Sequence, residues 1–211
     1  MKSTKREVFL TTAICLLPVL AGVLLWHRLP DPMPTHFNAA GEADGWSSRA
    51  FGVFFLPGLM VGINLLLHFA LSTDPKRQNM SPALRAVSVW TLPVISVLTS
   101  ALTYGSALGH EMNVQRWAPA LVALLFVLIG NYLPKTKQSY TMGIKLPWTL
   151  ASEENWNRTH RLAGFLWVIC GAVMLLVSLL GVWNMAVLLG LPLVMAAVPC
   201  VYSYLLYRKG V

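Results

Sequence analysis

Six apolar runs, separated by polar segments, dominate the pattern along the chain. Each run has 17 to 23 residues, close to the ~20 residues with which a helix crosses the apolar core of a bilayer. The runs lack the alternation of a barrel strand, and only helices or closed barrels satisfy the backbone inside lipid. The pattern therefore predicts an all-α, polytopic membrane protein with a six-transmembrane-helix bundle, in the cell membrane. The predicted spans are 8–26, 51–71, 86–108, 117–133, 162–182 and 185–207.

Lys and Arg are unevenly distributed between the polar segments. If the N-terminus is cytoplasmic, 13 of the 16 Lys and Arg residues fall on cytoplasmic segments, and only Arg28, Arg49 and Arg116 fall outside. The positive-inside rule therefore predicts that both termini are cytoplasmic. The net charge of +8 is then explained by attraction to anionic lipid headgroups, and no direct nucleic-acid partner is implied. Only 11% of the residues are charged, against about 25% in soluble domains, which agrees with a membrane protein.

The outer loop, which follows the first span, contains turn residues and stiff prolines. Pro30, Pro32 and Pro34 occupy alternate positions, which favours an extended, polyproline-like arm. Phe37 and Trp46 also indicate that this loop of some 24 residues is ordered rather than disordered.

The inner loop, residues 130–164, is the longest polar interruption and holds five of the Lys and Arg residues. Ser152 is a plausible N-cap, and Glu153 and Glu154 would lie in the first turn of the helix it opens. We expect a short interfacial helix from Glu153 to about Arg161 on the cytoplasmic surface, leading into the fifth span.

Two polar side chains lie within the second span. Asn64 and His68 are four residues apart and therefore share a helix face. One interpretation is structural, with Asn64 in an interhelical hydrogen bond and His68 reaching toward the cytoplasmic interface. The other is a transport or proton-relay site, because polar groups at this depth often serve function.

The sequences of the two loops resemble a known family. The inner-loop string GNYLPKTKQSYTMGIKLPWTLASEENWNRTHRLAG resembles the signature of the SdpI family of bacterial membrane proteins. The outer-loop string LPDPMPTHFNAAGEADGW resembles an uncharacterised domain that often precedes the SdpI region. The resemblance implies an N-terminal two-span unit, residues 1–84, and a four-span SdpI-like region, residues 85–211.

The resemblance also assigns candidate binding residues, none of them catalytic. The matching inner positions, implied to bind a partner, are Asn131, Pro134, Lys135, Lys137, Gly143, Pro147, Trp148, Thr149, Trp156, His160 and Arg161. Lys145 is added to them; family members often have Arg there, and Lys lacks the planar fork of Arg. The matching outer positions, implied to meet a ligand, are Pro34, His36, Phe37, Asn38, Gly41 and Trp46.

What the resemblance implies about function is immunity combined with signalling. The typical member protects its cell against a secreted antimicrobial peptide toxin and holds an ArsR-type autorepressor at the membrane, away from DNA. For this chain we accordingly expect membrane lipid, a peptide toxin and a cytoplasmic repressor as partners, and no cofactor.

Two other classes of function stay open. A membrane-embedded, metal-dependent enzyme would use the outer polar cluster of His36, Glu42 and Asp44, although no HExxH motif or cysteine pair accompanies it. A small transporter or peptide exporter would depend on Asn64 and His68, because no Asp, Glu, Lys or Arg lies in the middle of a span.

Overall fold

The computed structural model describes residues 3–182 and 186–211. Within them, six helical segments are long and apolar enough to cross a membrane, which confirms the predicted polytopic helical fold. They are Lys5–Leu24, Phe51–Thr73, Pro82–Ala107, Val114–Lys135, Glu153–Leu180 and Ala186–Arg208. Met185, the expected start of the sixth apolar run, lies outside the described residues.

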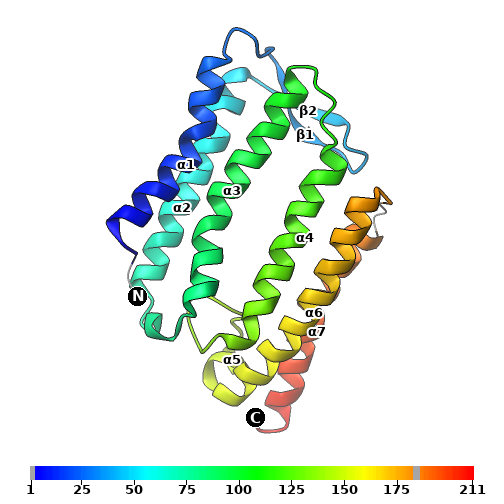
Figure 1. Ribbon diagram of the computed structural model, residues 1–211. Coiled ribbons are helices and arrows are strands. Elements are labelled where there is room, and N and C mark those ends of the chain that lie inside the picture. Colours follow the sequence, from blue (N-terminus) through cyan, green and yellow to red (C-terminus); the bar gives the residue numbers. More distant parts are fainter. Residues whose placement is uncertain (1–2, 183–185) are drawn as a thin grey trace. The chain divides into compact units, whose positions relative to one another are not determined.

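Helices make up most of the chain, and a two-stranded β-hairpin lies between the first two long helices, α1 and α2 (Figure 1). In chain order the elements are α1 Lys5–Leu24, β1 Met33–Phe37, β2 Ala43–Ser47, a π-helical turn Phe51–Phe55, α2 Leu56–Thr73, a 3-10 turn Arg77–Asn79, α3 Pro82–Ala107, α4 Val114–Tyr132, a 3-10 turn Leu133–Lys135, α5 Pro147–Ala151, α6 Glu153–Leu180, a π-helical turn Ala186–Gly190 and α7 Leu191–Arg208. The chain divides into two compact units, which are described separately.

Unit 2 comprises Ser3–Phe69 and Ser88–Ala118. Its helices are joined by side-chain to backbone hydrogen bonds: the Tyr104 hydroxyl donates to the carbonyl of Pro18 at 3.1 Å, and Ser96 donates to the carbonyl of Cys15 at 3.0 Å. An apolar core of Leu29, Met33, Val53 and Tyr104 lies beneath the hairpin. This core fixes the start of β1 against the helices.

The outer loop contains a β-hairpin, which the sequence pattern did not indicate. β1 and β2 pair antiparallel, with Met33 opposite Ser47 and Pro34 opposite Trp46. The expected polyproline-like arm is therefore wrong at Pro34, which lies inside a strand. The expectation of order in this loop is confirmed, because the hairpin has a defined register and its own buried base.

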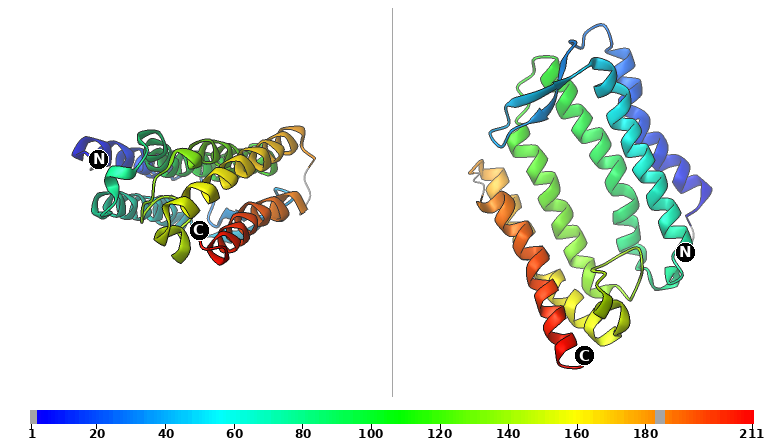
Figure 2. Two further views of the ribbon diagram at one scale, coloured as in Figure 1. Left: turned by 90° about the horizontal axis from the view of Figure 1, so that it is seen from below. Right: turned by 180° about the vertical axis from the view of Figure 1, so that it is seen from behind.

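Unit 1 comprises Ala70–Val87 and Pro119–Val211 among the described residues. Here α6 packs along α7, which lies beside it in the left view of Figure 2, and α5 packs against both helices. Gly130 of α4 and Gly164 of α6 allow these two helices to approach closely. A Cβ atom on Gly164 would lie 2.5 Å from the ring of Pro134, and one on Gly130 would lie 2.8 Å from Cβ of Trp167.

The start of the fifth span differs from the expectation. Ser152 caps the helix as predicted, its hydroxyl accepting from the Asn155 amide at 3.2 Å. The separate helix expected from Glu153 to about Arg161 is wrong, because these residues form the first turns of the continuous helix α6. No Pro interrupts the sequence between them and the apolar run, so the helix continues. A short helix does precede α6, but it is α5, with Pro147 in its first turn.

Candidate functional site

The inner loop, here residues 136–146, contains no helix or strand and is held by two fully buried side chains of α6. Nε1 of Trp156 donates to the Thr136 carbonyl at 2.8 Å, near the start of the loop. Nε2 of His160 accepts from the Ile144 amide at 2.8 Å, near its end. Both are carried by consecutive turns of one helix, so α6 fixes both ends of the loop.

His160 has both ring nitrogens engaged. Because Nε2 accepts from an amide, Nδ1 carries the proton and donates to the Trp156 carbonyl at 2.8 Å. The imidazole also stacks on the indole of Trp156, with ring centroids 3.9 Å apart and planes inclined by 20°. In this geometry the ring is neutral and serves as a positioning group for the loop.

Gly143 lies directly against this ring pair. Its φ of +104° is a backbone conformation that residues with a side chain rarely adopt. In addition, a Cβ atom there would lie 2.5 Å from Nε2 of His160 and 2.8 Å from the ring of Trp156. Gly143 is therefore required by the turn and by the close approach together.

Thr149 and Gln138 connect the loop to its neighbours in unit 1. The buried hydroxyl of Thr149 accepts from the Leu146 amide at 2.9 Å, which stabilises the start of α5. The amide group of Gln138 donates to the Thr149 carbonyl at 2.9 Å and accepts from Nζ of Lys76 at 2.7 Å. The carbonyl of Gln138 accepts from Asn79 at 3.0 Å, so the connection between α2 and α3 is bound to the same loop.

Asp74 is the acidic centre of this arrangement, and sequence reasoning missed it. Its Oδ2 accepts from the Ser139 hydroxyl at 2.7 Å and from the amides of Tyr140 and Thr141 at 3.0 and 2.8 Å. Its Oδ1 accepts from the Lys76 amide at 2.7 Å. Burial alone would raise the pKa of Asp74, but the hydrogen bonds from Ser139, Lys76 and Thr141 outweigh it and hold the pKa below its ordinary value. The sequence signal was an acid three residues after the end of an apolar run.

The remaining candidates of the inner motif, within residues 130–164, are exposed rather than buried. They are Asn131, Pro134, Lys135, Lys137, Lys145, Pro147 and Arg161. Nζ of Lys135 lies 5.4 Å from the ring centroid of Tyr132. Together these residues give the loop a basic outer surface supported by a buried interior.

Asn131, Pro134 and Arg161 also line a groove between α4 and α6, with a volume of 690 Å³. We call it the α4–α6 groove. It also contacts Arg158, which forms an ion pair with Glu154 one turn earlier in α6.

Trp148 and Asn155 contact α7 and attach it to the rest of unit 1. The indole of Trp148 packs on the rings of Tyr204 and Tyr207, with centroids 5.6 and 5.8 Å away. Asn155, a fully buried residue that sequence reasoning also missed, donates to the Ser203 carbonyl at 3.0 Å and accepts from the Ser203 hydroxyl at 2.6 Å. Trp148, which is half-buried, is therefore an aromatic contact to α7.

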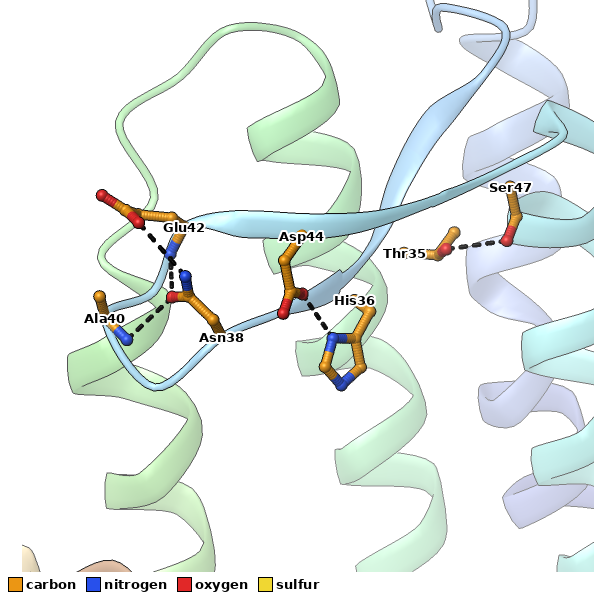
Figure 3. Close-up of polar contacts among 7 residues, drawn as sticks. All are labelled: Thr35, His36, Asn38, Ala40, Glu42, Asp44 and Ser47. Atoms are coloured by element: carbon orange, nitrogen blue, oxygen red, sulfur yellow. Dashed lines mark hydrogen bonds and ion pairs between the residues drawn. The ribbon is translucent and has the colours of Figure 1, made fainter. Parts of the chain in front are cut away.

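In the outer hairpin too, some candidate residues build or support the structure and others are exposed; Figure 3 shows the polar contacts of several of them. Asn38 builds the turn: its side-chain oxygen accepts from the amides of Ala40 and Glu42 at 2.9 and 3.1 Å, and its side-chain amide donates to Glu42. Gly41 has a φ of +80°, and a Cβ atom there would lie 2.9 Å from Gln115. Pro34 is buried and Phe37 is half-buried, whereas Trp46 is 57% exposed.

His36 and Asp44 form an exposed pair across the strands, with Nδ1 of His36 2.5 Å from Oδ1 of Asp44 (Figure 3). Glu42, the third member of the hypothetical metal site, is instead bonded to Asn38. In residues 3–182 and 186–211, no three His, Cys, Asp or Glu side chains form a group that could hold a metal ion.

Asn64 and His68 belong to a buried contact between α1 and α2. Asn64 donates to the hydroxyls of Thr11 and Thr12 at 3.1 and 3.2 Å, which confirms the interhelical hydrogen bond. His68 is only 4% exposed and pairs through Nε2 with Thr11 and through Nδ1 with Ser3, each at 2.9 Å. These hydroxyl groups satisfy both ring nitrogens of His68 within unit 2, and its reach toward the cytoplasmic interface stays a prediction.

The comparisons with known proteins match the two loops and their flanking helices. Residues 135–203 match the SdpI/YfhL protein family, and residues 13–61 match a domain of unknown function, DUF1648. The chain is also 23% identical over 206 residues to the immunity protein SdpI of Bacillus subtilis (strain 168), with 97% of each chain covered. No solved structure matches the chain significantly.

The matched regions contain the features described above. The SdpI/YfhL match begins at Lys135 and includes the inner loop, α5, α6 and most of α7, and the DUF1648 match includes the outer hairpin. The expected resemblance is thus confirmed over both regions and along nearly the whole length of a curated relative. The chain is a multi-pass membrane protein whose residues 135–203 match the SdpI/YfhL protein family and which is similar over nearly its whole length to an SdpI immunity protein.

Proposed function

We propose that this protein is a non-enzymatic membrane immunity protein that protects its cell from a secreted antimicrobial peptide and recruits a cytoplasmic autorepressor of the ArsR type. The relative with 97% coverage is named as an immunity protein, which supports the first part of the proposal. The second part depends on the inner loop as a binding surface.

One observation carries the proposal: the inner motif divides into buried residues that fix the loop and exposed basic residues that the fixed loop presents. Trp156, His160 and Thr149 are fully buried, whereas Lys137 and Lys145 are exposed. A surface held in one conformation loses little conformational entropy when a partner binds. The exposed lysines complement an acidic face of a cytoplasmic protein and accelerate its association.

The outer hairpin supports the peptide-binding part. It presents Trp46 and the pair of His36 and Asp44 on a two-stranded support whose turn is fixed by Asn38. An exposed Trp beside a polar pair suits an amphipathic peptide, because aromatic side chains provide much of the binding energy at protein interfaces.

The test of protection compares cells with and without the protein during exposure to a panel of membrane-active peptides. We expect expression to raise the tolerated concentration of at least one peptide, and the variant H36A/W46A to lose that gain while inserting normally into the membrane. Unchanged sensitivity across the whole panel would contradict the immunity function.

The test of recruitment uses the charges of the inner loop. We expect membranes that contain the wild-type protein to retain an ArsR-type repressor encoded in the same genome, and membranes with K137Q/K145Q to retain much less. R208Q/K209Q is the matched control, because it also removes two exposed cations, which lie at the end of α7 and outside the inner loop. Equal retention by K137Q/K145Q and the wild type would refute this part of the proposal and leave the protection result standing.

A further inference from the structure

The α4–α6 groove changes character along its length. Its lining includes Arg158, Arg161, Phe165 and Val168, all from α6. These positions are separated by three, four and three residues, so they share one face of the helix. At 1.5 Å per residue they extend over about 15 Å, from two guanidinium groups to two apolar side chains.

Two glycines, Gly130 and Gly164, line the groove where α4 and α6 pack closely. A Cβ atom on Gly164 would lie 2.7 Å from the carbonyl oxygen of Gly130, and one on Gly130 would lie 3.0 Å from that of Gly164. The backbone of both helices therefore forms part of the floor. Phe165, which is 71% exposed, stands beside this floor.

The groove also lies where the chain passes from polar to apolar residues. Leu162 begins the apolar run of α6, and the apolar run of α4 ends at Leu133, one residue before Pro134 of the lining. This is the level of the lipid headgroups in a membrane-spanning helix. The cationic end of the groove is therefore at headgroup level, and its apolar end faces acyl chains.

The charges at the cationic end favour an anionic occupant. None of the residues that line the groove is acidic. Arg158 is paired with the exposed carboxylate of Glu154, whereas Arg161 has no ion-pair or hydrogen-bond partner among the described side chains. A guanidinium group binds phosphate through two parallel hydrogen bonds.

We propose that the α4–α6 groove binds one anionic phospholipid, with its phosphate at Arg161 and Arg158 and an acyl chain along Phe165 and Val168. A soluble protein fits less well, because the apolar half of the groove begins at Leu162 and continues into the apolar run. The proposal does not depend on the immunity function, and it assigns Arg161 to lipid instead of to the repressor.

Native mass spectrometry of the full chain in detergent tests the proposal, with dioleoylphosphatidylglycerol and dioleoylphosphatidylcholine as probes. We expect the wild type to bind the anionic lipid roughly tenfold more tightly, as two arginines at the membrane surface provide. R158Q/R161Q should lose this preference, and R208Q/K209Q, which removes two exposed cations at the end of α7, should retain it. V168W, which fills the apolar half, should weaken the binding of both lipids.

Several outcomes would overturn the proposal. One is equal binding of the two lipids by the wild type, and another is an equal loss in R158Q/R161Q and R208Q/K209Q, which would indicate diffuse charge attraction. Displacement of the lipid by inorganic phosphate alone would show that the acyl chain contributes nothing. Thermal unfolding of each variant in detergent confirms that it is folded. If R158Q/R161Q is unfolded, R158K/R161K replaces it. We expect this variant to show a reduced preference for the anionic lipid, because Lys lacks the bidentate fork of Arg.

Discussion

Individual residues of the inner motif have roles that their chemistry alone does not reveal. Trp156 and His160 were expected to bind a partner, but both are fully buried and bind the backbone of the inner loop. The two residues are four positions apart and therefore share one face of α6. What that face meets depends on the path of residues 136–146, which have no regular secondary structure to predict.

The G143A variant tests the role of a single residue, Gly143, in the stability of the inner loop. We expect a marked loss of thermal stability in detergent, because the substitution combines an unfavourable φ with a collision against His160 and Trp156. Such backbone strain alone costs about 1–3 kcal/mol. G181A is the matched control: Gly181 also has a positive φ, of +70°, but no atom of the described residues lies within 4 Å of its Cβ position. Equal losses in the two variants would show that the ring contact is unimportant.

At the scale of elements, the spans were predictable, whereas their connections were not. Apolar runs of the right length locate helices because the bilayer imposes that length. The hairpin Met33–Phe37 with Ala43–Ser47 escaped prediction, since three prolines suggested an arm and the strands show little alternation. Asp74 escaped because its partners Ser139 to Thr141 are more than 60 residues away in the sequence.

The contact of Asp74 with the inner loop predicts a dependence of stability on pH. Because its pKa is lower in the folded state than its ordinary value of 3.8, ionised Asp74 contributes stability that is fully present above 3.8. This contribution is lost as the pH falls through the lower, folded-state pKa. We expect D74N to melt at a lower temperature than the wild type at neutral pH. The Asp74 carboxylate only accepts hydrogen bonds, whereas the amide group of Asn would direct N–H donors at the N–H and O–H donors that already surround it. The difference should shrink as the pH falls below 3.8, and a constant difference would show that ionisation is irrelevant.

The close contact between α4 and α6 predicts that alanine substitutions at two glycines, Gly164 and Gly62, have different effects on stability. G164A should destabilise the protein by about 1–3 kcal/mol, because the new methyl group meets the ring of Pro134 at 2.5 Å. G62A should be neutral or slightly stabilising, since nothing lies within 4 Å of that Cβ position. Gly58 and Gly62 have the four-residue spacing that is typical of close helix packing, but neither Cβ position has a neighbour within 4 Å among the described residues. Unfolding of both variants in detergent measures the difference, and a greater loss in G62A would indicate packing between protein copies.

At the scale of the whole molecule, the similarity to the SdpI family and the membrane location followed from two sequence motifs and six apolar runs. Orientation is still a prediction from charge. Introduced cysteines test it, because the native Cys15, Cys170 and Cys200 all lie within spans. An impermeant maleimide should label H36C in intact cells and K137C only after permeabilisation, as both side chains are exposed. The reverse pattern would place the inner loop outside the cell.

The inner loop is bound to fixed points at short intervals: Thr136 to Trp156, Gln138 to Asn79, Ser139 to Asp74 and Ile144 to His160. Most surface loops accept insertions and deletions, because little depends on their length. Here one extra residue between Thr136 and Ile144 would shift every later contact by one position. Homologues should therefore keep the number of residues in this segment constant even where the residues themselves differ, and length would be the more reliable marker of this site.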